Sequence, residues 1–204
     1  MSVELTNTLV DVRKAYRLVY LYQKNILSTI DRFAQEFQCS FYWWTPTETA
    51  PPPQRSTDIT KRWVWDLLPL YSTALLYYSE GGQPDDHSPG EWLLALHLTT
   101  DDEFESDGEE PNPVNFEKAE DSDTTINVTL WYCKKAMKEN WFYGVWNELE
   151  YPDEEYCEYD SPEGLICVQK EFSLNELENE ELIIKATQDF KNLLNSHIPT
   201  EDWT

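Results

Sequence analysis

Apolar residues recur every three or four positions through the first part of the chain. The recurring positions are Leu9, Val12, Tyr16, Val19, Ile26, Ile30, Phe33 and Phe37. This spacing follows the helical period of about 3.6 residues, so it places these side chains on one helix face. The sequence therefore predicts a long amphipathic helix over about 2–38.

A second helical pattern lies near the carboxyl terminus. Ser173 and Glu176 have the S-x-x-E spacing of a capping box, which marks a helix start. An apolar stripe follows at Leu177, Ile183, Ala186, Phe190, Leu193 and Leu194. Carboxylates precede lysines along this segment, in the order that the helix dipole favours. We expect this helix to begin at Ser173.

Between the two helical patterns, the period falls to about two and β-branched and aromatic residues become frequent. Candidate strands are 39–45, 70–79, 91–99, 125–133, 140–147 and 164–172. Their connections are too short for crossover helices, which favours antiparallel pairing. The sequence predicts a single α+β domain over 1–204. We expect a mostly antiparallel sheet of five or six strands, with both helices packed on it and long acidic loops.

Charge is concentrated in two of these loops. The chain has 39 acidic and 15 basic residues and a net charge of -24. Stretch 101–123 holds eleven carboxylates and one lysine, and stretch 148–163 holds eight carboxylates and no base. Such compositions bury little apolar surface. We expect 101–123 to be a mobile, solvated loop that contributes little to the fold.

This charge balance limits the partners of the protein. It disfavours direct binding to nucleic acids, whose phosphates are neutralised by basic side chains, and to anionic membranes. The longest uncharged apolar run, 67–79, is shorter than the roughly 20 residues of a membrane span. The four cysteines lack C-x-x-C spacing and no signal peptide is evident. These features favour a reducing, cytoplasmic environment.

Motif searches give no catalytic, metal or cofactor site. Glycine-rich phosphate loops and nucleophile elbows are absent. An EF-hand alignment of the 103–108 run places Val114 where a bidentate glutamate is required. The three histidines are scattered, and His97 alternates with Leu96 and Leu98 as an ordinary strand residue. No metal, cofactor or catalytic residue is therefore assigned.

Two aromatic runs, 41–44 and 141–146, have two interpretations. Two helix layers could bury both faces of such strands, or one face could stay exposed as an anchor for a partner, since Trp and Tyr dominate interface hot spots. Trp146 and Tyr156 are the candidate aromatic anchors. The candidate partner-binding carboxylates are Asp101, Asp102, Glu103, Glu105, Asp107, Glu109, Glu110, Glu154, Glu155, Glu158 and Asp160.

Three functions are compatible with the sequence. The leading hypothesis is a non-enzymatic interaction protein: an inhibitor, immunity protein or accessory subunit that binds a basic partner protein, such as a nucleic-acid-handling enzyme. A DNA mimic is the second, although most of its carboxylates would lie in loops instead of ordered rows. An enzyme with a carboxylate site hidden from sequence is the third.

Overall fold

A computed structural model describes residues 3–104, 109–116 and 118–198. It contains a six-stranded antiparallel sheet in the order β1-β2-β3-β4-β6-β5. The strands are β1 (Cys39–Pro46), β2 (Ser72–Ser79), β3 (Trp92–Thr99), β4 (Thr125–Cys133), β5 (Tyr156–Tyr159) and β6 (Leu165–Ser173). The helices are α1 (Val3–Gln35) and α2 (Glu180–His197). The predicted α+β architecture is confirmed.

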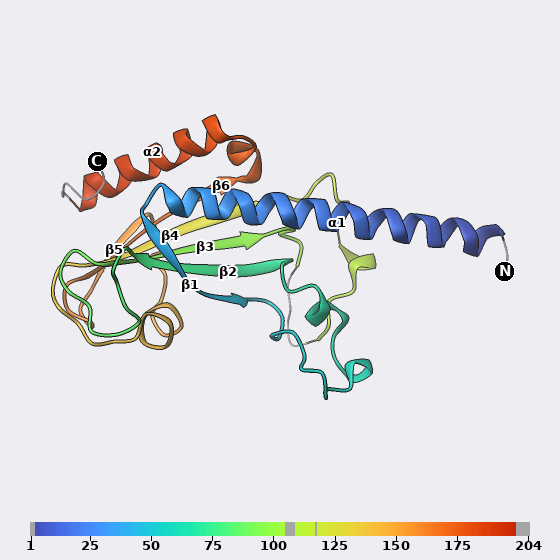
Figure 1. Cartoon of the computed structure of the whole chain (residues 1–204), viewed down its shortest axis with the longest axis horizontal. Coiled ribbons are helices and arrows are strands. Elements are labelled where there is room, and N and C mark those ends of the chain that lie inside the picture. Colours follow the sequence, from blue (N-terminus) through green and yellow to red (C-terminus); the bar gives the residue numbers. More distant parts are fainter. Residues whose placement is uncertain (1–2, 105–108, 117, 199–204) are drawn as a thin grey trace.

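Both helices cover the same face of the sheet (Figure 1). Side chains alternate along each strand, so Leu94, Leu96 and Leu98 of β3 share one core with Ile30 of α1 and Phe190 of α2. Burial of this apolar layer is the main stabilising contribution of the two helices.

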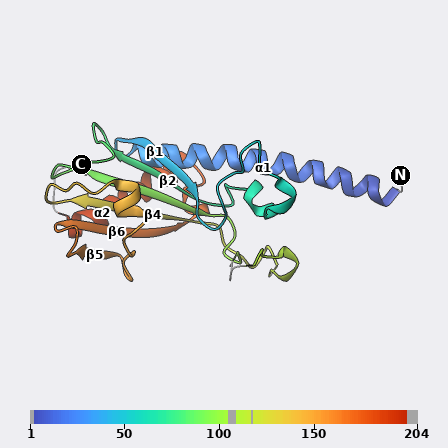
Figure 2. The same cartoon turned by 90° about the horizontal axis from the view of Figure 1, so that it is seen from below.

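The intervening residues pack on the opposite face. Neither α-helix of the described chain covers that face (Figure 2). Leu93 and Ala95 of β3 pack there with Trp131 of β4 and with Trp141 and Val145. Trp141 and Val145 belong to a π-helical turn over Trp141–Trp146. The predicted strand at 140–147 is therefore wrong. Two helix layers do not enclose the sheet either.

The π-helical turn forms because Asn140 caps it. The Asn140 side-chain oxygen accepts hydrogen bonds from the backbone N–H groups of Phe142 at 3.0 Å and Tyr143 at 2.9 Å. These donors would otherwise have no partner at the start of the turn. A capped turn thus replaces strand pairing in this aromatic segment.

The start of α2 also differs from the prediction. Asn179 caps α2, which begins at Glu180. Ser173 and Glu176 bracket a 3₁₀ turn over Leu174–Leu177, where the Glu176 carboxylate accepts a hydrogen bond from the Ser173 N–H at 3.0 Å. The capping-box spacing therefore marked a turn, and the helix starts after it.

α1 extends far beyond the sheet that it covers (Figure 1). Every side chain from residue 5 to residue 21 is exposed, whereas Ile26, Ile30 and Phe33 are buried. We call residues 5–21 the arm and the remainder of the described chain the body. The predicted helix is confirmed, but the body covers only its second half.

The 101–123 stretch is joined to the body by aromatic side chains. Phe104 is 7% exposed, and its ring centroid lies 5.0 Å from that of Trp65 and 5.2 Å from that of Tyr71. Phe116 also contacts Trp65, and the Trp65 indole donates a hydrogen bond to the Pro111 carbonyl at 2.8 Å. The burial of Phe104 shows that part of this loop packs against the body. The expected mobility of the loop stays a prediction.

Candidate functional site

The candidate site is an acidic turn at the β5 edge of the sheet, which we define as residues 152–155. Gln169 of β6 holds its backbone at three points. The Gln169 side-chain amide donates to the carbonyls of Pro152 at 2.7 Å and Glu154 at 3.1 Å, and its backbone N–H donates to the Glu155 carbonyl at 2.9 Å. Pro152 is itself buried. The backbone of the turn is therefore fixed on the sheet.

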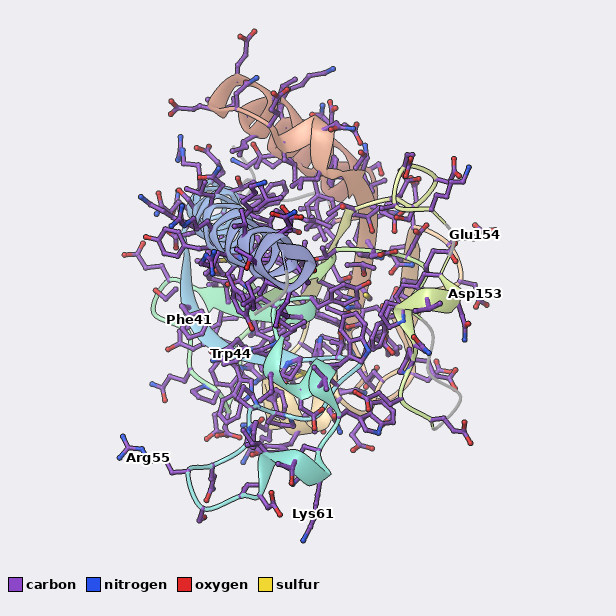
Figure 3. The ribbon with its side chains drawn as sticks, turned by 90° about the vertical axis from the view of Figure 1, so that its right-hand side faces the viewer. Phe41, Trp44, Arg55, Lys61, Asp153 and Glu154 are labelled. Carbon is purple, nitrogen blue, oxygen red and sulfur yellow. The ribbon has the colours of Figure 1, made fainter. Side chains whose placement is uncertain are left out.

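The carboxylates of this turn face solvent. Asp153, Glu154 and Glu155 are all exposed, and within the described part of the chain none of them forms an ion pair. Figure 3 shows Asp153 and Glu154 on one side of the molecule, away from Arg55 and Lys61. Three uncompensated negative charges are thus presented on a fixed backbone, an arrangement that attracts cations.

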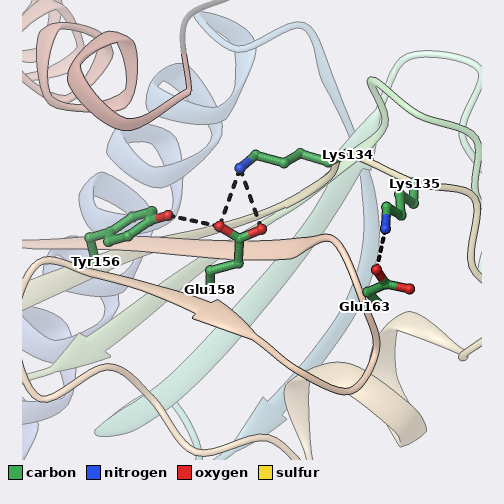
Figure 4. Close-up of polar contacts among 5 residues, drawn as sticks. All are labelled: Lys134, Lys135, Tyr156, Glu158 and Glu163. Carbon is green, nitrogen blue, oxygen red and sulfur yellow. Dashed lines mark hydrogen bonds and ion pairs between the residues drawn. The ribbon is translucent and has the colours of Figure 1, made fainter.

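Two neighbouring carboxylates are compensated instead (Figure 4). The Lys134 ammonium lies 3.3 Å from a Glu158 oxygen, which also accepts a hydrogen bond from the Tyr156 hydroxyl at 3.3 Å. Lys135 forms an ion pair with Glu163 and holds the pKa of that carboxyl below its usual value. The negative charge of Glu158 is therefore partly neutralised by Lys134, which its place among carboxylates in the sequence did not indicate.

The other candidate residues of this region have different environments. Asp160 is exposed. The half-buried Tyr156 stacks on His197 of α2, with ring centroids 4.4 Å apart. Trp146 is half-buried and stacks on Phe142 at 5.3 Å, beside the second core. Trp146 thus packs on the face of the sheet that the two α-helices leave uncovered, where it supports the core.

The predicted carboxylates of the 101–123 stretch serve partly as local hydrogen-bond acceptors. Asp101 accepts from the Glu103 N–H at 3.1 Å, and Asp102 from the Asp123 N–H at 2.9 Å. Glu110 accepts from the Val64 N–H, and Glu109 is exposed. Glu105 and Asp107 lie outside the described residues. These contacts make Asp101, Asp102 and Glu110 structural acceptors as well as surface charges.

Exposed aromatic residues are found at the opposite edge of the sheet. Phe41, Trp43 and Trp44 of β1 are all exposed, and β1 and β5 are the two outermost strands. Figure 3 shows Phe41 and Trp44 on the side opposite Asp153. An aromatic surface does exist, but it does not adjoin the acidic turn.

Catalytic and metal-binding sites find less support in the structure. Two clefts each contain two carboxylates. In the first, which holds Glu48 and Asp66, the buried Asp66 already accepts a hydrogen bond from the Ala50 N–H at 3.0 Å. The second holds Glu80 and Glu91, and Glu91 lies 3.5 Å from the His87 imidazole. His97 is hydrogen-bonded to Thr47 at 2.9 Å, and burial lowers its pKa. In the described ranges, no group of three or more His, Cys, Asp or Glu residues could hold a metal ion. None of the described helices is long and apolar enough to cross a bilayer.

The sequence located the acidic residues. It did not reveal the residues that fix the turn or that neutralise two of the carboxylates. Gln169, which fixes the turn, is a single glutamine in a strand and carries no motif. Lys134 and Lys135 lie outside the acidic stretches, directly after β4. The pairing of β4 with β6, together with that of β6 with β5, brings them to Glu163 and Glu158. Only a prediction of which strands are neighbours in the sheet could have located these contacts from the sequence.

The chain belongs to the PM0109 family, whose sequence model matches residues 2–199. A curated relative is "Uncharacterized protein PM0109" from Pasteurella multocida (strain Pm70). It is 24% identical over 151 residues, which cover 74% of this chain and 72% of the relative. No solved structure matches the chain. The family name states no activity.

Proposed function

We propose that this protein is a non-enzymatic interaction protein that binds a basic partner protein through the acidic turn. The observation that carries the proposal is the set of three exposed carboxylates, Asp153, Glu154 and Glu155, which lack ion pairs in the described chain. Opposite charge on a partner would accelerate association and select that partner over others. An inhibitor, an immunity protein and an accessory subunit all fit this description.

The fixed backbone supports this function. A side chain on a mobile loop loses conformational freedom on binding, which weakens the complex. Because Gln169 already holds the turn on β6, part of this loss has occurred before the partner arrives. The charges therefore act from a defined position.

A nucleic-acid-handling enzyme is the partner class that we favour. Its binding groove is already basic, since it must neutralise phosphates. This protein would occupy such a groove and exclude the nucleic acid. We place it in the cytoplasm, a proposal supported by the free state of the four cysteines, including the facing pair Cys157 and Cys167.

Affinity capture from lysate of the native cells tests the proposal. The immobilised protein is compared with the Asp153→Asn/Glu154→Gln/Glu155→Gln variant at low and high salt. We expect wild type to capture a basic protein at low salt and to lose it at high salt, because exposed charges are screened. The variant should capture much less of it, and duplex DNA should compete for the captured protein.

A matched control neutralises three exposed carboxylates elsewhere. Glu178, Glu181 and Asp189 lie in or beside α2, and their amide variant removes the same net charge. Capture by this control should equal that of wild type. Equal capture by all three proteins would contradict a role for the acidic turn.

A further inference from the structure

The arm of α1 presents an apolar stripe that nothing in the body covers. Steps of three and four residues alternate without interruption through Leu9, Val12, Tyr16, Val19, Gln23, Ile26, Ile30 and Phe33. The last three are buried on the sheet, whereas the first four are exposed, Tyr16 to 72%. We call Leu9, Val12, Tyr16 and Val19 the arm stripe. One stripe, apolar except at Gln23, is thus exposed along the arm and buried along the sheet.

The spacing of this stripe is that of a coiled-coil seam. Strict alternation of three and four gives a mean period of about 3.5 residues, which keeps an apolar seam facing a partner helix. A helix that only covered the sheet would need no apolar residues beyond it. Scattered exposed apolar residues are ordinary, but a regular row over two heptads indicates a helix partner.

We propose that the arm stripe pairs with the arm of a second copy of this chain, in antiparallel orientation. The orientation follows from the body, which packs on the same stripe from Ile26 onward. In a parallel pair, both bodies would need the same space beside the seam. In an antiparallel pair centred between Val12 and Tyr16, Leu9 lies opposite Val19 of the second copy and the bodies lie at opposite ends.

Most charges of the arm lie away from the seam of this pairing. Lys14 and Arg17 lie off the stripe by the helical period, and Lys14 is paired with Asp11 at 2.9 Å. Arg13 flanks the stripe and faces Arg13 of the second copy close to the twofold axis, so this like-charge contact opposes the pairing until salt screens it. The strongly acidic bodies repel each other, and the arms hold them apart on the order of 25 Å, at about 1.5 Å per residue.

The available area indicates a modest affinity. Two arm stripes with their flanking residues bury on the order of 1,000 Å² in total, which is near the lower limit for a specific interface. A cleft of about 270 Å³ lies between α1 and the 3₁₀ turn where the arm meets the body, but half of its lining is polar, so it adds little apolar area to the arm stripe. We therefore expect a dimer that dissociates on dilution.

Sedimentation equilibrium of the full chain over a concentration and salt series tests the proposal. We expect a reversible monomer–dimer equilibrium that strengthens as salt screens the repulsion between bodies. Binding of a basic partner should weaken under the same change, so the two interactions are distinguishable. A protein that stays monomeric at every concentration and salt would overturn the proposal.

Two composition-matched variants locate the interface. Leu9→Glu/Val12→Glu places carboxylates in the stripe, whereas Val10→Glu/Leu18→Glu places them on other faces of the same arm, at positions that are also exposed. The first should raise the dimer dissociation constant about a hundredfold, because charge is excluded from an apolar seam. The second should leave it nearly unchanged. Equal effects of the two variants would overturn the proposal.

Cross-linking and vesicle binding decide between the remaining arrangements. Under oxidation, a mixture of Leu9→Cys and Val19→Cys chains should form a mixed disulfide, with wild type as the control for native cysteines. Leu9→Cys alone should not cross-link, since its two copies lie about 15 Å apart along the antiparallel seam. Efficient Leu9→Cys cross-linking would overturn the orientation. Monomers that bind vesicles of phosphatidylglycerol and phosphatidylcholine through the stripe would overturn the second copy as occupant.

Discussion

Cys157 and Cys167 face each other across the β5–β6 pair, and their environments differ. Cys157 is half-buried, and a hydrogen bond from the Cys167 thiol, which outweighs partial burial, lowers the pKa of Cys157 to about 6. Cys167 is buried, and burial raises its pKa, so it keeps the proton that it donates. The protein thus stabilises one thiolate at its acidic edge.

We predict that iodoacetamide modifies Cys157 before the other cysteines at neutral pH. The thiolate is the nucleophile and predominates above the pKa, so the rate should rise through about pH 6. Peptide mass spectrometry across a pH series measures the rate at each cysteine. Cys167→Ala removes the hydrogen-bond donor and should move the midpoint upward. An unchanged midpoint in a folded variant would show that Cys167 does not set this pKa.

Among the elements, the 101–123 connection offers a direct test of packing. Phe104→Ala should lower the free energy of unfolding by about 3 kcal/mol, because it removes a buried ring from contact with Trp65 and Tyr71. Val114→Ala is the control in the same connection, since Val114 is 85% exposed. Urea denaturation measures both. Equal stabilities would support the expectation of a loop that contributes little.

The π-helical turn depends on its cap. Asn140→Ala should lower the free energy of unfolding by about 1 to 2 kcal/mol. The Asn140 side chain accepts hydrogen bonds from the N–H groups of Phe142 and Tyr143 and donates one to Asp85 at 3.1 Å. Asn147→Ala at the end of the same turn is the matched control, because its amide contacts the adjacent, exposed Glu148. In thermal unfolding, Asn140→Ala should have a clearly lower melting temperature than Asn147→Ala. A similar loss in both would refute the capping role.

The elements could be predicted where their periodicity was long. The α1 pattern spans many turns, and β3 alternates cleanly between two cores, so both were found. The 140–147 segment is too short for its period to separate strand from helix, and the side chain of Asn140 decided the outcome. β5 was missed because Tyr156–Tyr159 is short and lies among carboxylates. Its pairing with β6 is a tertiary contact.

For the whole molecule, the composition predicted that the surface charge is negative, but it did not predict how that charge is distributed over the surface. Lys134 and Lys135 neutralise Glu158 and Glu163, and Gln169 fixes the turn that leaves Asp153 exposed. Each of these contacts joins residues that are at least 17 positions apart in the sequence. The apolar stripe of α1 was visible in the sequence, but the point where the sheet ends was not, so the arm was unforeseen.

The net charge of -24 leads to a last prediction, that salt raises the melting temperature of the isolated protein. Like charges destabilise the compact state, and their range falls from about 30 Å at 0.01 M salt to about 8 Å at 0.15 M. Calorimetry across this range should show a rising melting temperature. Asp153→Asn/Glu154→Gln/Glu155→Gln should melt higher at low salt and respond less to added salt, because these carboxylates lack ion pairs in the described chain. Glu158→Gln, which loses the Lys134 pair, should bring no such gain. A melting temperature independent of salt would mean that bound cations already compensate the acidic surface.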